Sequence, residues 1–220
     1  MHKDRQLTYD LSQKYGNEQV FVIPTYKMNH IEDKFTMLNK FQSGRIANIA
    51  LLNSLNKYDK IGLYLERYKA EYDNAFIQPI PFSIITTATQ HKYYVCERIA
   101  GDDRLHKQYS LGWGGHIEPQ DGIKKIILSA LNRELLEEVD IVYAKDNNKY
   151  FLGTIRNLSS STSEHIGFVF LVKATSVKVK ETDKAKGHWL TLEQLEKQYY
   201  RFEDWSKILI DYLYKHKKFL

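Results

Sequence analysis

Cysteine is almost absent from this sequence, and so are the long apolar runs of a membrane protein. Cys96 is the single cysteine among 220 residues, so no intramolecular disulfide can form, which fits a reducing cytoplasm. No apolar run approaches the roughly 20 residues that a membrane-spanning helix needs. The polar residues 1–19 lack the apolar segment of a secretory signal. Internal repeats and low-complexity tracts are missing too. These absences predict a cytoplasmic protein that does not enter a membrane.

The composition is that of a folded, basic protein. Hydrophobic residues make up 43% of the chain and aromatic residues 13%, enough for a real core, and the length suits one domain or one domain with an extension. The net charge of +5 favours anionic partners such as phosphates or nucleic acid. It is also the charge of an ordinary soluble basic protein, so charge alone selects no partner.

Residues 1–75 carry no recognisable motif, and we expect them to form an N-terminal extension or accessory subdomain. Residues 20–25 read as a strand ended by Pro24. The apolar spacing over residues 46–55 suits a short helix, and residues 60–72 fit either a strand or a helix. This extension is interpreted as a cover for a sheet edge. The alternative is an element that selects substrate or forms a homodimer.

Residues 76–220 show a more regular pattern, typical of an α/β domain. Apolar and β-branched segments predict a hairpin, then a long helix, then two more strands, and Thr191 is a good N-cap for a following helix. The final helix has an apolar face at Trp205, Ile208, Leu209 and Tyr212. The predicted strands are 82–88, 93–98, 150–157, 166–173 and 188–190, and the main helices are 123–139 and 202–214. This order predicts a mixed sheet with helices packed on it.

The long predicted helix carries an acidic cluster. Glu134, Glu137 and Glu138 are spaced i, i+3 and i+4, so they share one sector of a helix. Arg133 lies four residues before Glu137, where it can hold that carboxylate in place. A solvated acidic stripe is the plain interpretation, and the segment Arg133–Glu138 alone is common in proteins. One arginine cannot neutralise three glutamates, however, whereas Mg²⁺ is bound by carboxylate and carbonyl oxygens.

The acidic helix together with the preceding glycine pair resembles the Nudix box of the Nudix hydrolases. That signature is a glycine, five residues, a glutamate, seven residues, and then Arg-Glu-U-x-Glu-Glu-x-Gly-U, where U is bulky and aliphatic. Gly115 matches the first glycine, and residues 133–138 with Ile141 match the second half. Three positions depart from it. Asp121 replaces the first glutamate, the gap from Asp121 to Arg133 is four residues longer, and Asp140 replaces the last glycine.

The similarity extends from residue 76 to residue 220. A bacterial subgroup of Nudix proteins with a diverged box shares further segments with this chain. They are Arg104-Leu105-His106, residues 110–117, His165-Ile166-Gly167 and residues 202–206.

The resemblance implies a Nudix-like α/β/α sandwich around a mixed sheet, and a hydrolase that cleaves a diphosphate linked to another moiety, usually a nucleoside. It implies Mg²⁺ or Mn²⁺ held by Glu134, Glu137 and Glu138 with the carbonyl of Gly115. One carboxylate would act as general base, for which both Glu134 and Glu164 are open. The expected partner is a small nucleotide or other diphosphate, with nucleic acid a less favoured alternative.

Other residues around the box have less certain roles. Arg98, Arg104 and His116 are candidates for contacts with substrate phosphates, although the arginines also suit a plain surface and His116 suits a hydrogen-bonded structural histidine. Trp113 suits either base stacking or core packing. An isomerase of isopentenyl diphosphate would need a reactive cysteine, and nothing marks Cys96 as one. The alternative function is a catalytically weak Nudix module that binds nucleotide or RNA as a sensor.

Overall fold

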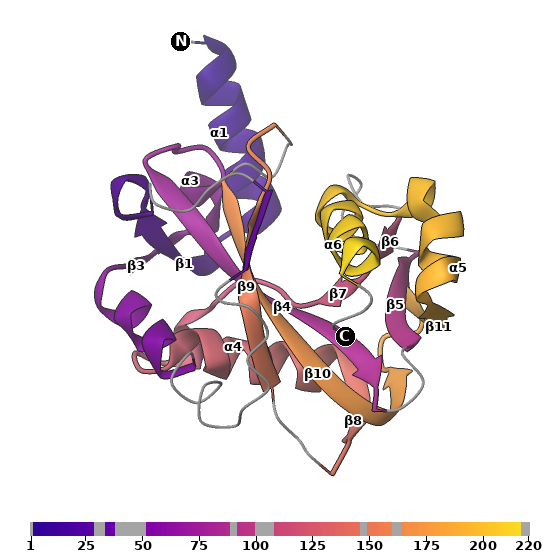
Figure 1. Ribbon diagram of the computed structural model, residues 1–220. Coiled ribbons are helices and arrows are strands. Elements are labelled where there is room, and N and C mark those ends of the chain that lie inside the picture. Colours follow the sequence, from indigo (N-terminus) through magenta and orange to yellow (C-terminus); the bar gives the residue numbers. More distant parts are fainter. Residues whose placement is uncertain are drawn as a thin grey trace.

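A computed structural model of the protein (Figure 1) describes residues 2–28, 34–37, 52–88, 92–99, 108–145, 149–159 and 164–216. Its helices are α1 (His2–Tyr15), α3 (Arg67–Ala70), α4 (Ile126–Glu138), α5 (Leu192–Lys197) and α6 (Asp204–Lys215). Its 3-10 helices are η1 (Thr25–Lys27), η2 (Leu55–Lys60), η4 (Pro119–Asp121) and η5 (Tyr199–Arg201). The first strands are β1 (Gln19–Pro24), β2 (Lys34–Met37), β3 (Leu63–Glu66), β4 (Phe76–Thr87), β5 (Lys92–Arg98), β6 (Tyr109–Ser110) and β7 (Gly112–Trp113). The later strands are β8 (Val139–Tyr143), β9 (Lys149–Arg156), β10 (His165–Val179) and β11 (Ala185–Thr191).

Within the described residues the strands form one 11-stranded mixed sheet. Its central order is β11-β5-β4-β10-β9-β2. The longest pairing joins β4 and β10 in parallel, from His165 opposite Gln78 to Ala174 opposite Thr87. The pairs of β9 and β8 with β10, and of β5 with β4, are antiparallel. The predicted mixed sheet is therefore confirmed.

Helices cover both faces of this sheet. Successive side chains of a strand point to opposite faces, and β10 shows the alternation: Phe168 and Phe170 pack in one core, Val169 and Leu171 in another. The first core includes the apolar face of α4, and the second includes α5 and α6. In Figure 1 the sheet runs between α4 and the yellow α5–α6 pair. The predicted α/β/α sandwich is confirmed.

The N-terminal third joins the same sheet and core. Ile23 of β1 pairs with Ile77 of β4, and the Phe21 N–H donates to the Ile117 carbonyl at 2.8 Å. Phe21, Leu55 and Tyr58 are buried in the core that contains α4. These residues therefore form part of the core against which the acidic helix α4 packs. The domain boundary after residue 75 and the homodimer stay predictions.

Several element boundaries differ from those predicted. Helix α4 begins at Ile126 rather than at residue 123 because Lys125 is left-handed, with φ of 53°, and it ends at Glu138 because Val139 starts β8. Residues 60–72 form both predicted alternatives, β3 and then α3. The sequence predicts no regular element at the positions of α1, β2, β6, β7 and β8. The predicted helix 46–55 lies mostly outside the described residues.

Strands β4, β10 and β11 are longer than the predicted strands 82–88, 166–173 and 188–190, whereas β5, β9 and α6 lie close to their predicted ranges. The predicted cap at Thr191 is confirmed, since its hydroxyl accepts from the Gln194 N–H. No described helix has both the length and the apolarity that a membrane span requires.

Candidate metal and catalytic site

The start of helix α4 is fixed by a residue from the N-terminal third. The Asp59 carboxylate accepts the backbone N–H groups of Lys125 and Ile126, the latter at 3.2 Å. These N–H groups have no partner inside the helix, so a side-chain acceptor from elsewhere caps it. The position of the acidic residues along α4 therefore depends on a segment that precedes the Nudix-like region.

Arg133 ties the acidic helix to the loop before it. Its Nε and Nη2 atoms donate to the two oxygens of Asp121 at 2.9 and 3.0 Å, and Nη2 also donates to the His116 carbonyl at 2.7 Å. Its Nη1 atom lies 2.8 Å from Glu134 and 2.9 Å from Glu137. The predicted contact of Arg133 with Glu137 is confirmed. The ion pair of Arg133 with Asp121 is bidentate, because two N–H groups of the planar guanidinium match the two oxygens of the carboxylate.

Asp121 occupies a structural position in this network. Its side chain is 2% exposed, and besides Arg133 it accepts the Glu118 backbone N–H at 2.8 Å. All its described contacts are thus with groups that hold the loop 116–121 against α4. The shorter acid at the place of the signature's first glutamate still reaches the arginine, across the four-residue longer connection.

Glu134 and Glu138 lie one helical turn apart beside the glycine pair. Glu134 is buried against Gly115, where an added Cβ would come within 2.6 Å of the carboxylate. Only glycine at this position allows the loop to approach so closely. Glu138 receives the Gly114 N–H, while its Oε2 atom is buried with no hydrogen-bond partner among the described residues. The two carboxylates therefore lie at a site where the described residues leave part of their hydrogen-bonding capacity unused.

Burial raises the pKa values of both carboxyl groups. The pKa of Glu134 rises to about 7, chiefly because the group is desolvated, although Arg133 opposes the shift. Burial together with the negative charge of Glu134 raises the pKa of Glu138 to about 8, and Arg98 opposes it. Perturbed pKa values of neighbouring acids in one place are typical of functional sites. A cation placed between them would restore both to the ionised form.

The donor set fits a hard divalent cation. Two carboxylates on one helical turn face a glycine loop whose carbonyls have no Cβ to shield them, and one of their oxygens has no hydrogen-bond partner in the part of the chain that the structure describes. Carboxylate and carbonyl oxygens are the ligands that Mg²⁺ and Mn²⁺ accept. Glu137 differs from the other two glutamates, because its side chain is 53% exposed and ion-paired with Arg133. The sequence reading grouped all three in one sector, and the structure separates Glu137 from the buried pair.

The residues predicted to bind phosphate differ in where they lie relative to the carboxylate pair. Arg98 of β5 lies close enough to Glu138 to oppose its pKa shift, so it belongs to the surroundings of the carboxylate pair. Arg104 lies outside the described residues. Trp113 is 3% exposed, stacks on Tyr94 and donates its indole N–H to the Tyr94 carbonyl at 2.9 Å. Trp113 is therefore a core residue rather than a stacking surface for a base.

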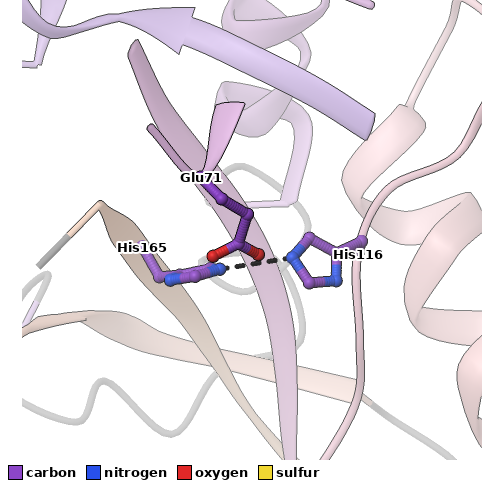
Figure 2. Close-up of side chains that lie close together, drawn as sticks. All are labelled: Glu71, His116 and His165. Atoms are coloured by element: carbon purple, nitrogen blue, oxygen red, sulfur yellow. Dashed lines mark hydrogen bonds between the residues drawn. The ribbon is translucent and has the colours of Figure 1, made fainter. Parts of the chain in front are cut away.

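His116 and Glu164, both named from the sequence, meet at His165. The Nε2 atoms of His116 and His165 lie 3.2 Å apart, and Glu164 Oε1 lies 3.1 Å from the other ring nitrogen, Nδ1, of His165. Glu71, which the sequence reading did not single out, directs its carboxylate at the two imidazoles (Figure 2). No sequence pattern joins these residues, because they come from three segments that only the fold brings together.

Cys96 has the environment of a structural thiol. It is 4% exposed, and burial raises its pKa to about 11. A thiol with such a pKa is protonated near neutral pH and is a poor nucleophile. This agrees with the expectation that Cys96 carries no isomerase chemistry.

Known proteins share this fold and part of this sequence. Protein YmaB of Bacillus subtilis (strain 168) is 32% identical over 160 residues, which cover 68% of this chain and 77% of YmaB. The crystal structure of Tm1382, a candidate Nudix hydrolase, superposes with a TM-score of 0.71 at 31% identity, and covers 90% of this chain and 99% of Tm1382. No family model matches the chain.

A more distant structure shares the fold alone. It is a bifunctional NMN adenylyltransferase/ADP ribose pyrophosphatase from Francisella tularensis, solved in complex with AMP and an Mn ion. Its TM-score is 0.51 at 16% identity, and the match covers 80% of this chain and 51% of that protein.

The sandwich fold, the glycine loop facing an acidic helix, and these likenesses define the class of protein. The chain belongs to the Nudix hydrolase family. The enzyme class predicted from residues 114–141, a Nudix-type pyrophosphohydrolase, is thereby confirmed.

Proposed function

We propose that this protein is a Mg²⁺- or Mn²⁺-dependent hydrolase of nucleoside diphosphates linked to another moiety, and that it acts by attack of water on phosphorus. The observation that carries the proposal is the buried pair Glu134 and Glu138. Their raised pKa values and the unpartnered Oε2 atom of Glu138 suit two carboxylates arranged for a cation. In an amphipathic helix with a solvated acidic stripe, these groups would face water instead.

Glu134 and Glu138 would hold the cation, with Glu137 and the Gly115 carbonyl at its rim. A bound divalent cation supplies positive charge that neutralises the diphosphate oxygens as the transition state forms. The protein's own part is orientation. Arg133 fixes Glu134 and Glu137 from one side, and the Gly114 N–H fixes Glu138 from the other. Such fixed geometry supplies much of the rate enhancement in phosphoryl transfer.

The structure favours Glu134 over Glu164 as the general base. A base must lie within reach of the water whose proton it removes, and Glu134 lies beside Gly115 in the carboxylate pair that is proposed to hold the cation. The Glu164 carboxylate lies against His165, and its backbone carbonyl accepts the Gln78 N–H at 2.8 Å. We therefore assign the removal of a proton from the attacking water to Glu134, and an orienting contact with His165 to Glu164.

The substrate is proposed only as a class. Arg98 lies beside the carboxylate pair, where it can attract a substrate phosphate once the cation has neutralised Glu138. His116 follows Gly115 directly, so a phosphate seated on the glycine loop would lie near it; this contact, like that of Arg104, stays a prediction.

A panel assay tests the function and separates it from nucleotide sensing without turnover. The purified protein is incubated with nucleotide sugars, dinucleoside polyphosphates, nucleoside triphosphates and capped RNA, with Mg²⁺, with Mn²⁺ and with a chelator. We expect metal-dependent release of products from at least one class, lost in Glu134→Gln and retained in Glu196→Gln, a control on the exposed face of α5. Tight binding of a panel member without any turnover would establish the sensor instead.

A further inference from the structure

Three side chains with metal-binding groups converge outside the acidic helix. Glu71 follows α3, His116 follows the glycine pair, and His165 is the first residue of β10. Each offers one ligand atom, and the three atoms all lie within 4.8 Å of one another. Figure 2 shows the glutamate carboxylate and the two imidazole rings directed toward a common point.

The spacing of the two imidazoles suits a shared ion. Zinc binds histidine nitrogen at about 2.0–2.1 Å in tetrahedral sites, which places two ligand nitrogens roughly 3.3 Å apart. The observed Nε2 to Nε2 distance is 3.2 Å. A hydrogen bond from one neutral imidazole to the other would give the same distance. Such a bond involves only the two rings and one proton. It therefore gives no reason for the Glu71 carboxylate to be directed at the same point.

The cluster is largely shielded from solvent, with His165 buried and Glu71 and His116 partly buried, which strengthens interactions between its charged groups. The side chain of His165 is 7% exposed and that of Glu71 is 5% exposed. A buried carboxylate is stabilised by nearby positive charge, and Arg67 Nε lies 3.4 Å from Glu71. A cation at the centre of the cluster would add a second positive charge next to this carboxylate.

A second carboxylate, that of Glu164, lies near the ring nitrogen of His165 that faces away from the cluster, an arrangement common among metal-binding histidines. Metal ligands of this kind usually direct the free ring N–H at a carboxylate, which fixes the tautomer and the ring orientation. Glu164 Oε1 lies 3.1 Å from Nδ1 of His165. The contact is within distance but outside hydrogen-bond geometry, so a small turn of the Glu164 side chain would align it. With Nδ1 as donor, Nε2 carries the lone pair that a metal needs.

We propose that Glu71, His116 and His165 form a second metal site, selective for a zinc-type transition-metal ion. Two imidazoles and one carboxylate suit zinc, with one position left for water or another ligand, whereas the all-oxygen pair on α4 suits Mg²⁺. The ion ties the end of α3, the glycine loop and β10 together. It therefore connects the N-terminal third to the loop that faces Glu134. This proposal is independent of the proposed hydrolysis, because its test measures bound metal.

The test is a metal-binding measurement on the full chain without an affinity tag. The protein is stripped with a chelator and dialysed against Zn²⁺ in excess Mg²⁺, and bound zinc is measured by elemental analysis. Co²⁺ serves as a second probe, because tetrahedral Co²⁺ with nitrogen ligands absorbs strongly in the visible range. We expect about one Zn²⁺ per chain and the tetrahedral Co²⁺ spectrum.

Matched variants assign the ion to its ligands. Glu71→Gln and His116→Asn each lose the bound zinc, and Glu164→Gln weakens binding by about 10- to 100-fold. His188→Ala, a histidine outside the cluster, and Glu134→Gln, in the acidic helix, keep it. Circular dichroism checks that each variant is folded. His116 is only partly buried, so His116→Asn is the variant least disruptive to packing.

Three results would overturn the second site. One is the absence of stoichiometric zinc and of a tetrahedral Co²⁺ spectrum in the wild type. Another is zinc that persists in folded His116→Asn and Glu71→Gln. The last is zinc that disappears in Glu134→Gln, which would place the ion at the acidic helix. None of these results bears on whether the protein hydrolyses diphosphates, since that is decided by the substrate panel.

Discussion

Two carboxylates of this region, Asp121 in the loop before the acidic helix and Glu138 at the end of that helix, have opposite surroundings. Both oxygens of Asp121 are bonded to Arg133, and one also accepts the Glu118 N–H. One oxygen of Glu138 is buried without a described hydrogen-bond partner, and burial raises the pKa of this carboxyl to about 8. Arg133 compensates the charge of Asp121, whereas the proposed function assigns compensation of Glu138 to a bound cation. Under that proposal, Asp121 stabilises the fold and Glu138 takes part in the chemistry.

The largest expected effect is loss of activity when Glu138 is neutralised. In Glu138→Gln we expect kcat/KM to fall by about three orders of magnitude, because a catalytic cation is worth several kcal/mol and each 1.4 kcal/mol is tenfold. Thermal unfolding at pH 7 without metal should show no loss of stability, because a carboxyl with a pKa of about 8 is already mostly uncharged there. Glu196→Gln is the control. If Glu138→Gln were as active as this control, Glu138 would have no role in catalysis and would not differ from Asp121 in this respect.

Removal of Arg133 should have the largest effect on stability. In Arg133→Ala the buried Asp121 loses its partner, and breaking a buried pair from one side costs about 3–5 kcal/mol. Urea unfolding measures the free energy of unfolding of this variant. The control is Lys69→Ala, whose exposed pair with Glu66 should contribute little to stability, because solvent screens exposed ion pairs. Equal losses in the two variants would show that Asp121 does not depend on Arg133.

The pH dependence of stability without metal should reflect Glu134 and Glu138. Their folded pKa values of about 7 and 8 lie above the ordinary value of 4.5, so the folded state holds more protons than the unfolded state between pH 4.5 and 8. Stability is then fully present below pH 4.5 and falls as pH rises to 8. Each pKa unit is worth about 1.4 kcal/mol, so we expect Tm to drop by roughly 5 °C or more.

Glu138→Gln provides the control for that pH effect. It should flatten the dependence on pH, and saturating Mg²⁺ should flatten it in the wild type. A Tm that rises from pH 5 to pH 8 in chelator would contradict the assigned pKa directions.

A smaller effect is expected when the glycine loop is pushed away from the helix. In Gly115→Ala the new Cβ would come within 2.6 Å of Glu134 Oε1, so the carboxylate must move by a fraction of an ångström. Displacements of this kind cost about 10- to 100-fold in rate. Steady-state kinetics should show that loss with little change in Tm. Unchanged kinetics would mean that the Glu134 position is not critical.

The sequence predicted the parts of the site that lie within one segment. The positions of Glu134 and Glu138 on one helical face follow from spacing alone, and so does the contact of Arg133 with Glu137. The order of predicted strands and helices indicated a mixed sheet with helices packed on it, and the resemblance to the Nudix box implied the sandwich. The exposure of Glu137 was not predictable, because it depends on the position of the Arg133 guanidinium, which the ion pair with Asp121 sets.

The parts that the sequence did not reveal depend on contacts between distant segments. Asp59 caps α4 across more than 60 positions, and Glu71 of the N-terminal third lies beside two histidines from later segments of the chain. A left-handed residue at Lys125 shortened the helix, and no propensity rule marks lysine for that conformation. Such features arise from tertiary packing and have no local signature.

The measurement that tests the central claim most directly is a crystal structure soaked with Mn²⁺, with the ion located by its anomalous scattering. The account predicts an Mn²⁺ ion in coordination contact with carboxylate oxygens of both Glu134 and Glu138. An ion found only elsewhere, or no ion at the acidic helix at millimolar Mn²⁺, would contradict it.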